Sequence, residues 1–174
     1  MIYELLKSVC TKLEALNLPY MLSGSLAMSF YTVGRNTQDI DIVIELNESR
    51  IEQFLSVFNN HYYHQPSIIV EIKKRGMFNI IDFETGMKVD FILRKSSEYA
   101  QVAFARRQVS HTFGFAVWVV SLEDLILAKL MWIQNIFSDR QVNDIRTLLL
   151  NPSVDLVYLK EWSKITNIKT FELI

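Results

Sequence analysis

The chain has 174 residues, of which 50% are hydrophobic and 21% charged, so it has the size of one domain and can bury a substantial core. Its formal net charge of −1 excludes a general electrostatic attraction to nucleic acid, and any polynucleotide would have to meet a local basic patch. Cys10 is the only cysteine, which excludes an internal disulfide and is typical of a reducing compartment. No signal-peptide pattern and no membrane-spanning apolar run is visible, so we expect a soluble, cytoplasmic protein without a membrane partner.

Hydrophobic periodicity and turn residues predict helices and strands that alternate along the chain. The predicted helices cover residues 2–16, 25–32, a segment that begins at Asn47, 68–75, 96–107, 121–133, a segment that begins at Ser138, and a closing helix after Pro152. The predicted strands cover residues 20–22, 39–46, 78–83, 88–93 and 115–120, and residues 34–37 form a loop. The segment 68–70 suits a strand equally well. No linker or repeat divides the chain, so we expect one α+β domain with a core over about residues 20–120 and a helical part over 121–174.

Two carboxylates open the strand predicted for residues 39–46. Residues two apart on a strand point to the same face, so Asp39 and Asp41 project together while the isoleucines between them face the other way. Two adjacent carboxylates disfavour each other's ionisation unless a cation lies between them, and oxygen ligands suit Mg²⁺. The pair therefore indicates a metal site, and the alternative is an exposed edge with solvated charges.

A glycine turn precedes this strand. Gly24 and Ser25 follow an apolar segment and lead into a predicted helix, whose free backbone N–H groups favour a phosphate. Ser25 could equally serve only as a helix cap. Lys129 interrupts the apolar segment 125–133, so it either extends its charge to the surface or points at a phosphate in a cleft.

The order of these features resembles the signature of the nucleotidyltransferase (polymerase-beta-like) superfamily. Gly24-Ser25 is followed by thirteen residues and then by Asp39-Ile40-Asp41, and Asp90, within the strand predicted for residues 88–93, matches the third carboxylate of the superfamily. The resemblance implies a nucleotidyltransferase fold, a mixed β-sheet flanked by helices with the C-terminal helices packed alongside. It also implies that Asp39, Asp41 and Asp90 are catalytic and bind Mg²⁺, with Gly24 and Ser25 at the phosphates of an NTP.

Later segments are similar to bacterial minimal nucleotidyltransferases related to AbiEii toxins. The matching blocks are Phe104–Arg107, Val120–Leu130 and Asp139–Ile145. This resemblance implies that Lys129 contacts nucleotide phosphates with Asp144 beside it. Arg106 is a further candidate phosphate contact, or else the cationic end of a helix. At 140–141 the chain has Arg-Gln where many AbiEii-type proteins have Lys-Asp.

Two functions from different classes follow. The first is a Mg²⁺-dependent nucleotidyltransferase that transfers NMP from an NTP to an acceptor, which is tRNA or another RNA, a protein or a small molecule. A toxin with a partner antitoxin is one version of this function, and an enzyme that modifies antibiotics is another. The alternative is a catalytically silent module that binds a nucleotide or a partner protein with the same fold, and a purely structural role is a third reading.

Overall fold

The computed structural model describes residues 1–34 and 36–174, so the predicted loop 34–37 includes one position, Arg35, outside the described residues. The strands are β1 (Tyr20–Ser23), β2 (Asp39–Ile44), β3 (His61–Tyr62), β4 (Met77–Asp82), β5 (Lys88–Leu93), β6 (Gln108–Ser110) and β7 (Val117–Val119). The α-helices are α1 (Ile2–Ala15), α2 (Gly24–Ala27), α3 (Ile51–Val57), α4 (Gln65–Lys74), α5 (Glu98–Ala105), α6 (Leu122–Ile133), α7 (Asp139–Leu149) and α8 (Leu156–Ile165). Short 3₁₀ turns, η1 (Met28–Phe30) and η2 (Glu48–Arg50), follow α2 and precede α3.

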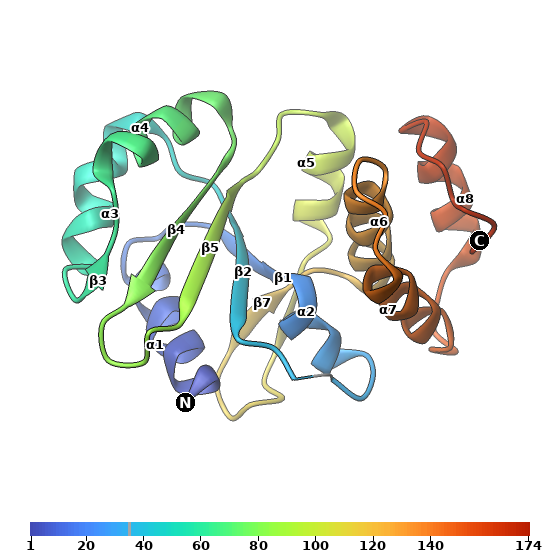
Figure 1. Ribbon diagram of the computed structural model, residues 1–174, viewed down its shortest axis with the longest axis horizontal. Helices are drawn as coiled ribbons and strands as arrows, with labels where there is room; N and C mark the ends of the chain where they lie inside the picture. The colour runs from blue at the N-terminus through green and yellow to red at the C-terminus, as the bar shows by residue number, and fades with distance from the viewer. Residues whose placement is uncertain (35) are drawn as a thin grey trace.

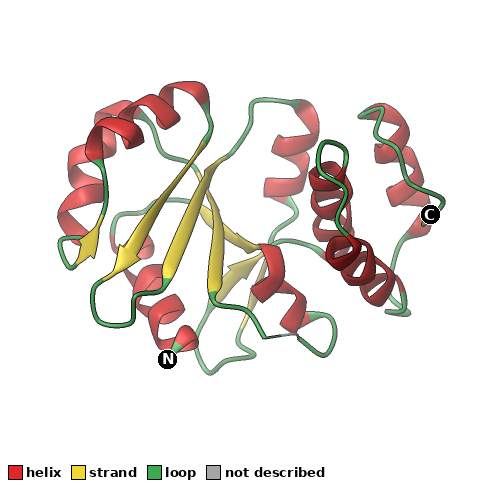
Figure 2. Cartoon of the chain, in the orientation of Figure 1, coloured by secondary structure: helices red, strands yellow, loops and turns green. Residues whose placement is uncertain are grey.

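One mixed sheet contains the seven strands in the order β3-β4-β5-β2-β1-β7-β6. The central pair β2 and β5 is parallel, as is β1 with β7, while β2 runs antiparallel to β1 and β5 antiparallel to β4. Helices α1, α3 and α4 gather on one side of the picture in Figure 1, and α5 to α8 follow on the other side. Figure 2 shows the same arrangement by element type, and the α+β class expected from the sequence is confirmed.

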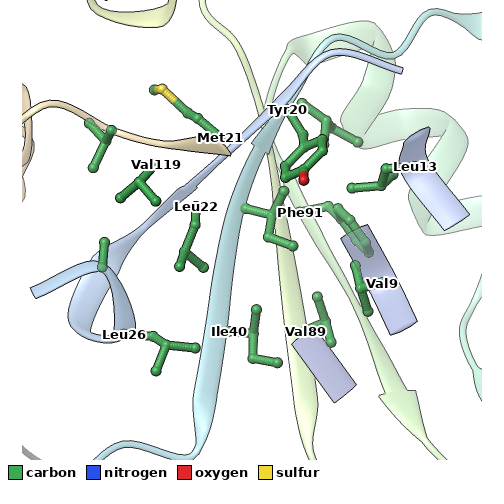
Figure 3. Packing of buried hydrophobic residues seen from close by; sticks show 14 of the residues in the cluster. Val9, Leu13, Tyr20, Met21, Leu22, Leu26, Ile40, Val89, Phe91 and Val119 are labelled. Carbon is green, nitrogen blue, oxygen red and sulfur yellow. The ribbon is translucent and has the colours of Figure 1, made fainter. Parts of the chain in front are cut away.

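The buried side of the central strands holds the core. Ile40, Ile42 and Ile44 of β2 are fully buried, as the alternation of the strand predicts. Figure 3 shows Val9 and Leu13 of α1 against this side of the sheet, near Val89 and Phe91 of β5. The opposite face of the same strands carries Asp39, Asp41 and Asp90. The alternation of the isoleucines therefore turns these carboxylates away from this part of the core.

The predicted strands and most predicted helices are confirmed within a few residues. The segment predicted as 68–75 is the helix α4 (Gln65–Lys74), whose first turn contains Pro66, and the fixed φ of proline suits that position. Two short strands were missed: β3, which pairs with β4, and β6, which lies in the sequence directly after α5. Cys10 is buried on α1, as expected for a small apolar residue. Among the described residues, none of the helices combines the length and apolar character that a bilayer crossing requires.

Candidate active site

Four polar side chains form a row across the middle of the sheet. Asp41 of β2 is directly opposite Ser23 of β1 on one side and Asp90 of β5 on the other, and Asp90 is opposite Asn79 of β4. Residues paired in register share a face, so Asp41 and Asp90 are side-chain neighbours. The superfamily resemblance groups Asp90 with Asp39 and Asp41, and the structure places Asp90 directly beside Asp41. Asp39 pairs with Lys88 at the start of the two strands, and its side chain is 59% exposed.

Gly24 brings the backbone of the turn directly against Asp41. Its φ is +64°, a conformation that favours glycine, and a Cβ atom built on it would lie 1.9 Å from Oδ2 of Asp41. Any residue other than glycine at position 24 would therefore clash with the Asp41 side chain. The turn where β1 passes into α2 is therefore held in contact with the carboxylate row, as the resemblance to the superfamily implies.

The surroundings of Asp41 disfavour the negative charge of its carboxylate. Burial raises the pKa of its carboxyl to about 6, and the neighbouring carboxylates of Asp90 and Asp39 contribute in the same direction. Lys88, on the same face of β5, partly neutralises the negative charge of these carboxylates. Its Nζ lies 2.7 Å from Oδ2 of Asp90 and 3.9 Å from Oδ1 of Asp39, and the hydrogen bond to Asp90 raises the pKa of the lysine. The sequence analysis assigned no role to Lys88, although its position two residues before Asp90 places both on one face.

The carboxylate oxygens of Asp41 and Asp90 are suitable ligands for a hard divalent cation. Oδ1 of Asp90 is buried and has no hydrogen-bond partner, and Asp41 beside it is half-buried with a disfavoured charge. Carboxylate oxygens of this kind are preferred ligands of Mg²⁺. Within residues 1–34 and 36–174, no group of three or more His, Cys, Asp or Glu side chains is close enough to hold a metal ion. The fit thus rests on Asp41 and Asp90, and the three-ligand set with Asp39 remains a prediction.

Lys129 does not extend its charge to the surface, so that reading of the sequence is wrong. The side chain is almost fully buried, and its Nζ donates to Oδ2 of Asp144 at 2.8 Å and to Oε1 of Gln141 at 3.0 Å. Lys129 and Asp144 lie together, as the resemblance implies, and their pair ties α6 to α7. Helix α2, which contains Ser25, also packs on α6, and Ser25, Lys129 and Asp144 each make further interactions.

Arg106 belongs to a separate polar cluster between α5, α6 and α8. Its Nε lies 3.1 Å from Oδ2 of Asp124 and its Nη2 3.0 Å from Oε2 of Glu123. The guanidinium also stacks on the ring of Tyr158 at 3.9 Å, and the Tyr158 hydroxyl donates to the other carboxylate oxygen of Asp124. These contacts engage Arg106 within the protein, outside the row of Ser23, Asp41 and Asp90, and its predicted phosphate contact remains untested.

A nucleotidyltransferase is the class of protein that this arrangement of sheet, glycine turn and carboxylates resembles. The family model described as a nucleotidyltransferase of unknown function (DUF6036) matches residues 1–171, so the chain belongs to this family. No curated protein matches the chain.

Solved structures share the fold at low identity. The antibiotic-resistance factor ANT(2'')-Ia in solution is 14% identical with a TM-score of 0.60, covering 94% of this chain and 90% of that one. Its crystal structure in complex with adenylyl-2''-tobramycin is 13% identical with a TM-score of 0.57, covering 94% and 95%. The lincosamide antibiotic adenylyltransferase LnuA bound to lincomycin is 12% identical with a TM-score of 0.57, covering 83% and 94%. These likenesses establish the nucleotidyltransferase fold for the chain.

Proposed function

We propose that the protein is a Mg²⁺-dependent nucleotidyltransferase that transfers NMP from an NTP to an acceptor hydroxyl. The observation that carries the proposal is the register of Asp41 with Asp90, with Gly24 packed against Asp41. This combination places paired carboxylates beside a turn whose backbone can approach phosphate oxygens. Membership of a nucleotidyltransferase family supports it.

The residues divide into two groups by role. Asp39, Asp41 and Asp90 would hold Mg²⁺, which when bound neutralises charge on the phosphate oxygens. Gly24 and Ser25 bind the β- and γ-phosphates, and Lys129 supports the same region from α6, held by Asp144. Asp90 accepts the proton of the acceptor hydroxyl. A bond forms between the acceptor oxygen and the α-phosphorus, the bond from the α-phosphorus to the bridging oxygen breaks, and pyrophosphate leaves.

The experiment is transfer of label from α-³²P-NTPs, with Mg²⁺, to acceptors in a cell extract and to a panel of hydroxyl compounds. We expect labelling by the wild type and a loss of at least about 100-fold in Asp41→Asn and Asp90→Asn, the scale of removing a group that acts at the reacting centre. Asp139→Asn, an exposed carboxylate at the start of α7, is the matched control and should keep full activity. Equal labelling by the wild type and Asp41→Asn would exclude this site as the catalyst.

The structures of similar fold suggest a class of acceptor for this chain. ANT(2'')-Ia and LnuA have antibiotics as partners in their structures. A small hydroxyl-bearing molecule is therefore our first acceptor for this chain, ahead of tRNA, another RNA or a protein. The relation to AbiEii toxins, with an antitoxin as partner, is the second version of the same activity. Inhibition of growth on expression, relieved by a gene product encoded beside it, would distinguish the toxin.

A second function has one specific observation in its favour. The ammonium group of Lys88 lies 2.7 Å from Oδ2 of Asp90, so the proposed metal ligand already has a cation in contact with it. In a catalytically silent module that binds nucleotide, this lysine would take the place of the metal ion. Calorimetry distinguishes the two: NTP binding of equal affinity with Mg²⁺ and with EDTA favours the silent module, and binding that requires Mg²⁺ favours the enzyme.

A further inference from the structure

A cavity of about 850 Å³ opens on the same face of the sheet as the carboxylate row. Ser23 lines it, and its floor contains Met21, Val43 and Ile92. These three pair in register, and each lies two residues from a member of the row: Met21 before Ser23, Val43 after Asp41 and Ile92 after Asp90. Two residues on a strand span roughly 6.6 Å. The cavity therefore begins one side-chain spacing away from the carboxylates.

The walls of the cavity are mainly apolar. They come from α5, α6 and α8, and the residues that form them include Tyr99, Ala103, Met131, Trp132, Trp162 and Ile165. The rings of Tyr99 and Trp162 pack together with centroids 5.3 Å apart. The volume falls within the roughly 300–1,000 Å³ of pockets that enclose drug-sized molecules.

The charged groups at the cavity are mostly engaged elsewhere. Arg94 pairs with Glu45, and Nζ of Lys95 donates to the backbone carbonyl of Arg75. Asp124 is held by Arg106, Ser121 and Tyr158 in the polar cluster. Glu98, exposed at the start of α5, is the remaining charged residue of the lining. Among the described residues that line the cavity, Arg94 and Asp124 are in ion pairs, and Lys95 is tied to a backbone carbonyl at the exposed rim, so little charge faces a triphosphate or a polycation.

The position of the carboxylate row indicates which of the two substrates, NTP or acceptor, the cavity binds. On β1 the chain passes from Met21 in the cavity floor through Ser23 in the row to Gly24 in the turn. The carboxylates therefore lie between the cavity and the turn that is proposed to bind the phosphates. In phosphoryl transfer the attacking and leaving oxygens lie roughly in line on opposite sides of phosphorus. With pyrophosphate leaving towards Gly24 and Ser25, the attacking hydroxyl arrives from the cavity side.

We propose that this cavity binds the acceptor, and that the acceptor is an uncharged, mainly apolar molecule with a hydroxyl group. The proposal rests on the proposed function and specifies its substrate class. The acceptor body packs on the aromatic and aliphatic walls, and its hydroxyl projects past Ser23 to the carboxylates. Its oxygen bonds to the α-phosphorus of the NTP, its proton passes to the carboxylate of Asp90, and pyrophosphate leaves. A polycationic aminoglycoside does not match this lining.

The test uses prodan, an uncharged naphthalene fluorophore whose emission changes on transfer to an apolar site. We expect one prodan to bind per chain. Trp132→Ala and Ile165→Lys should weaken binding at least about fivefold, the effect of roughly 1 kcal/mol of lost apolar contact. Both side chains are more than half exposed, at 58% and 57%, so these variants should remain folded. Val157→Lys, at 75% exposure on the same helix as Ile165 and outside the lining, is the matched control and should bind as the wild type does.

Competition decides between acceptor and nucleobase. ATP with Mg²⁺ should leave prodan bound, and tobramycin should not displace it. Displacement by ATP would assign the cavity to the base and overturn the proposal, as would equal prodan binding by Ile165→Lys and Val157→Lys. Asp41→Asn should bind prodan with unchanged affinity, because the assay needs no transfer. Failure of the proposed function would therefore appear as absent labelling with intact prodan binding, whereas failure of this inference appears in the binding itself.

Discussion

Gly24 and Asp41 are packed so closely that residue 24 has no room for a side chain, since a Cβ atom there would lie 1.9 Å from Oδ2 and 2.5 Å from Cγ of Asp41. The contact joins the first residue of α2, directly after β1, to the central strand β2, and the rest of α2, η1 and a loop separate the two residues in the sequence. It therefore links the two halves of the motif physically: the turn cannot shift without moving the carboxylate.

The first prediction concerns this contact. Gly24→Ala should abolish transfer activity and lower the free energy of unfolding, because the methyl group displaces Asp41 in addition to straining a backbone at positive φ. Gly86→Ala is the matched control: Gly86 also has a positive φ, of +68°, but nothing lies within 4 Å of its Cβ position. The control should lose only about 1–2 kcal/mol, the cost of the left-handed conformation. Urea unfolding measures both variants.

A double variant separates strain from displacement. Gly24→Ala with Asp41→Ala removes the closest contacts, so it should recover part of the stability that Gly24→Ala loses. Additive losses in the double variant, with no recovery, would show that the two residues are not in conflict.

The second prediction concerns Lys88, which competes with a metal ion for Asp90. Lys88→Met should tighten binding of Mn²⁺, a spectroscopic substitute for Mg²⁺, by up to about fivefold, since an exposed ion pair is worth roughly 0.2–1 kcal/mol. Electron paramagnetic resonance of free Mn²⁺ measures this affinity. Lys73→Met is the control, because Lys73 forms an exposed pair with Glu48 on other elements. Weaker Mn²⁺ binding in Lys88→Met would instead mean that the lysine helps to assemble the site.

The positions of Asp41 and Asp90 could be predicted from the sequence because both signals are local. Each carboxylate interrupts an apolar strand, and the period of two fixes the face on which it lies. Lys88 carries the same local signal, in the alternation Lys88-Val89-Asp90, and could have been found. Its pairing with Asp39 could not, because it depends on the register of β2 with β5.

The partners of Arg106 and Lys129 come from other helices, and no local sequence pattern marks these pairs. Lys129 lies in an apolar helix, and its sequence context alone favours a surface-seeking side chain; only the docking of α7 supplies Asp144. Strand β6 is three residues long and follows a helix without a turn signal, so its pairing with β7 decides its conformation. Tertiary contacts thus determined the partners of Arg106 and Lys129 and the conformation of β6.

The third prediction concerns the polar cluster of Arg106. Arg106→Met should destabilise the fold by about 2–3 kcal/mol, because it leaves Glu123 and Asp124 buried without their cation. This is below the cost of breaking a fully buried pair, since the Arg106 side chain is 38% exposed. Combining Arg106→Met with Asp124→Asn and Glu123→Gln should recover part of the loss. Chemical denaturation monitored by tryptophan fluorescence measures these changes. A variant that keeps wild-type stability but loses NTP affinity would restore the phosphate role.

The fourth prediction concerns pH and His61, which is buried against Phe58 near Asp82 and Lys12. Burial lowers the pKa of His61, and the charge of Lys12 adds to this while Asp82 opposes it. Below about pH 6.5 the unfolded chain takes up a proton that the folded chain resists, so His61 makes the free energy of unfolding fall as pH falls from 7 to 5. His61→Phe should flatten this part of the profile, while His111→Gln, at an exposed position, should leave it unchanged. The pH range remains above the region in which Asp82 titrates, because the pKa of that carboxyl is lowered by its hydrogen bonds from Thr85. Equal slopes in the wild type and His61→Phe would show that the pKa of His61 is the same in the folded and unfolded chains, with Asp82 offsetting the effects of burial and Lys12.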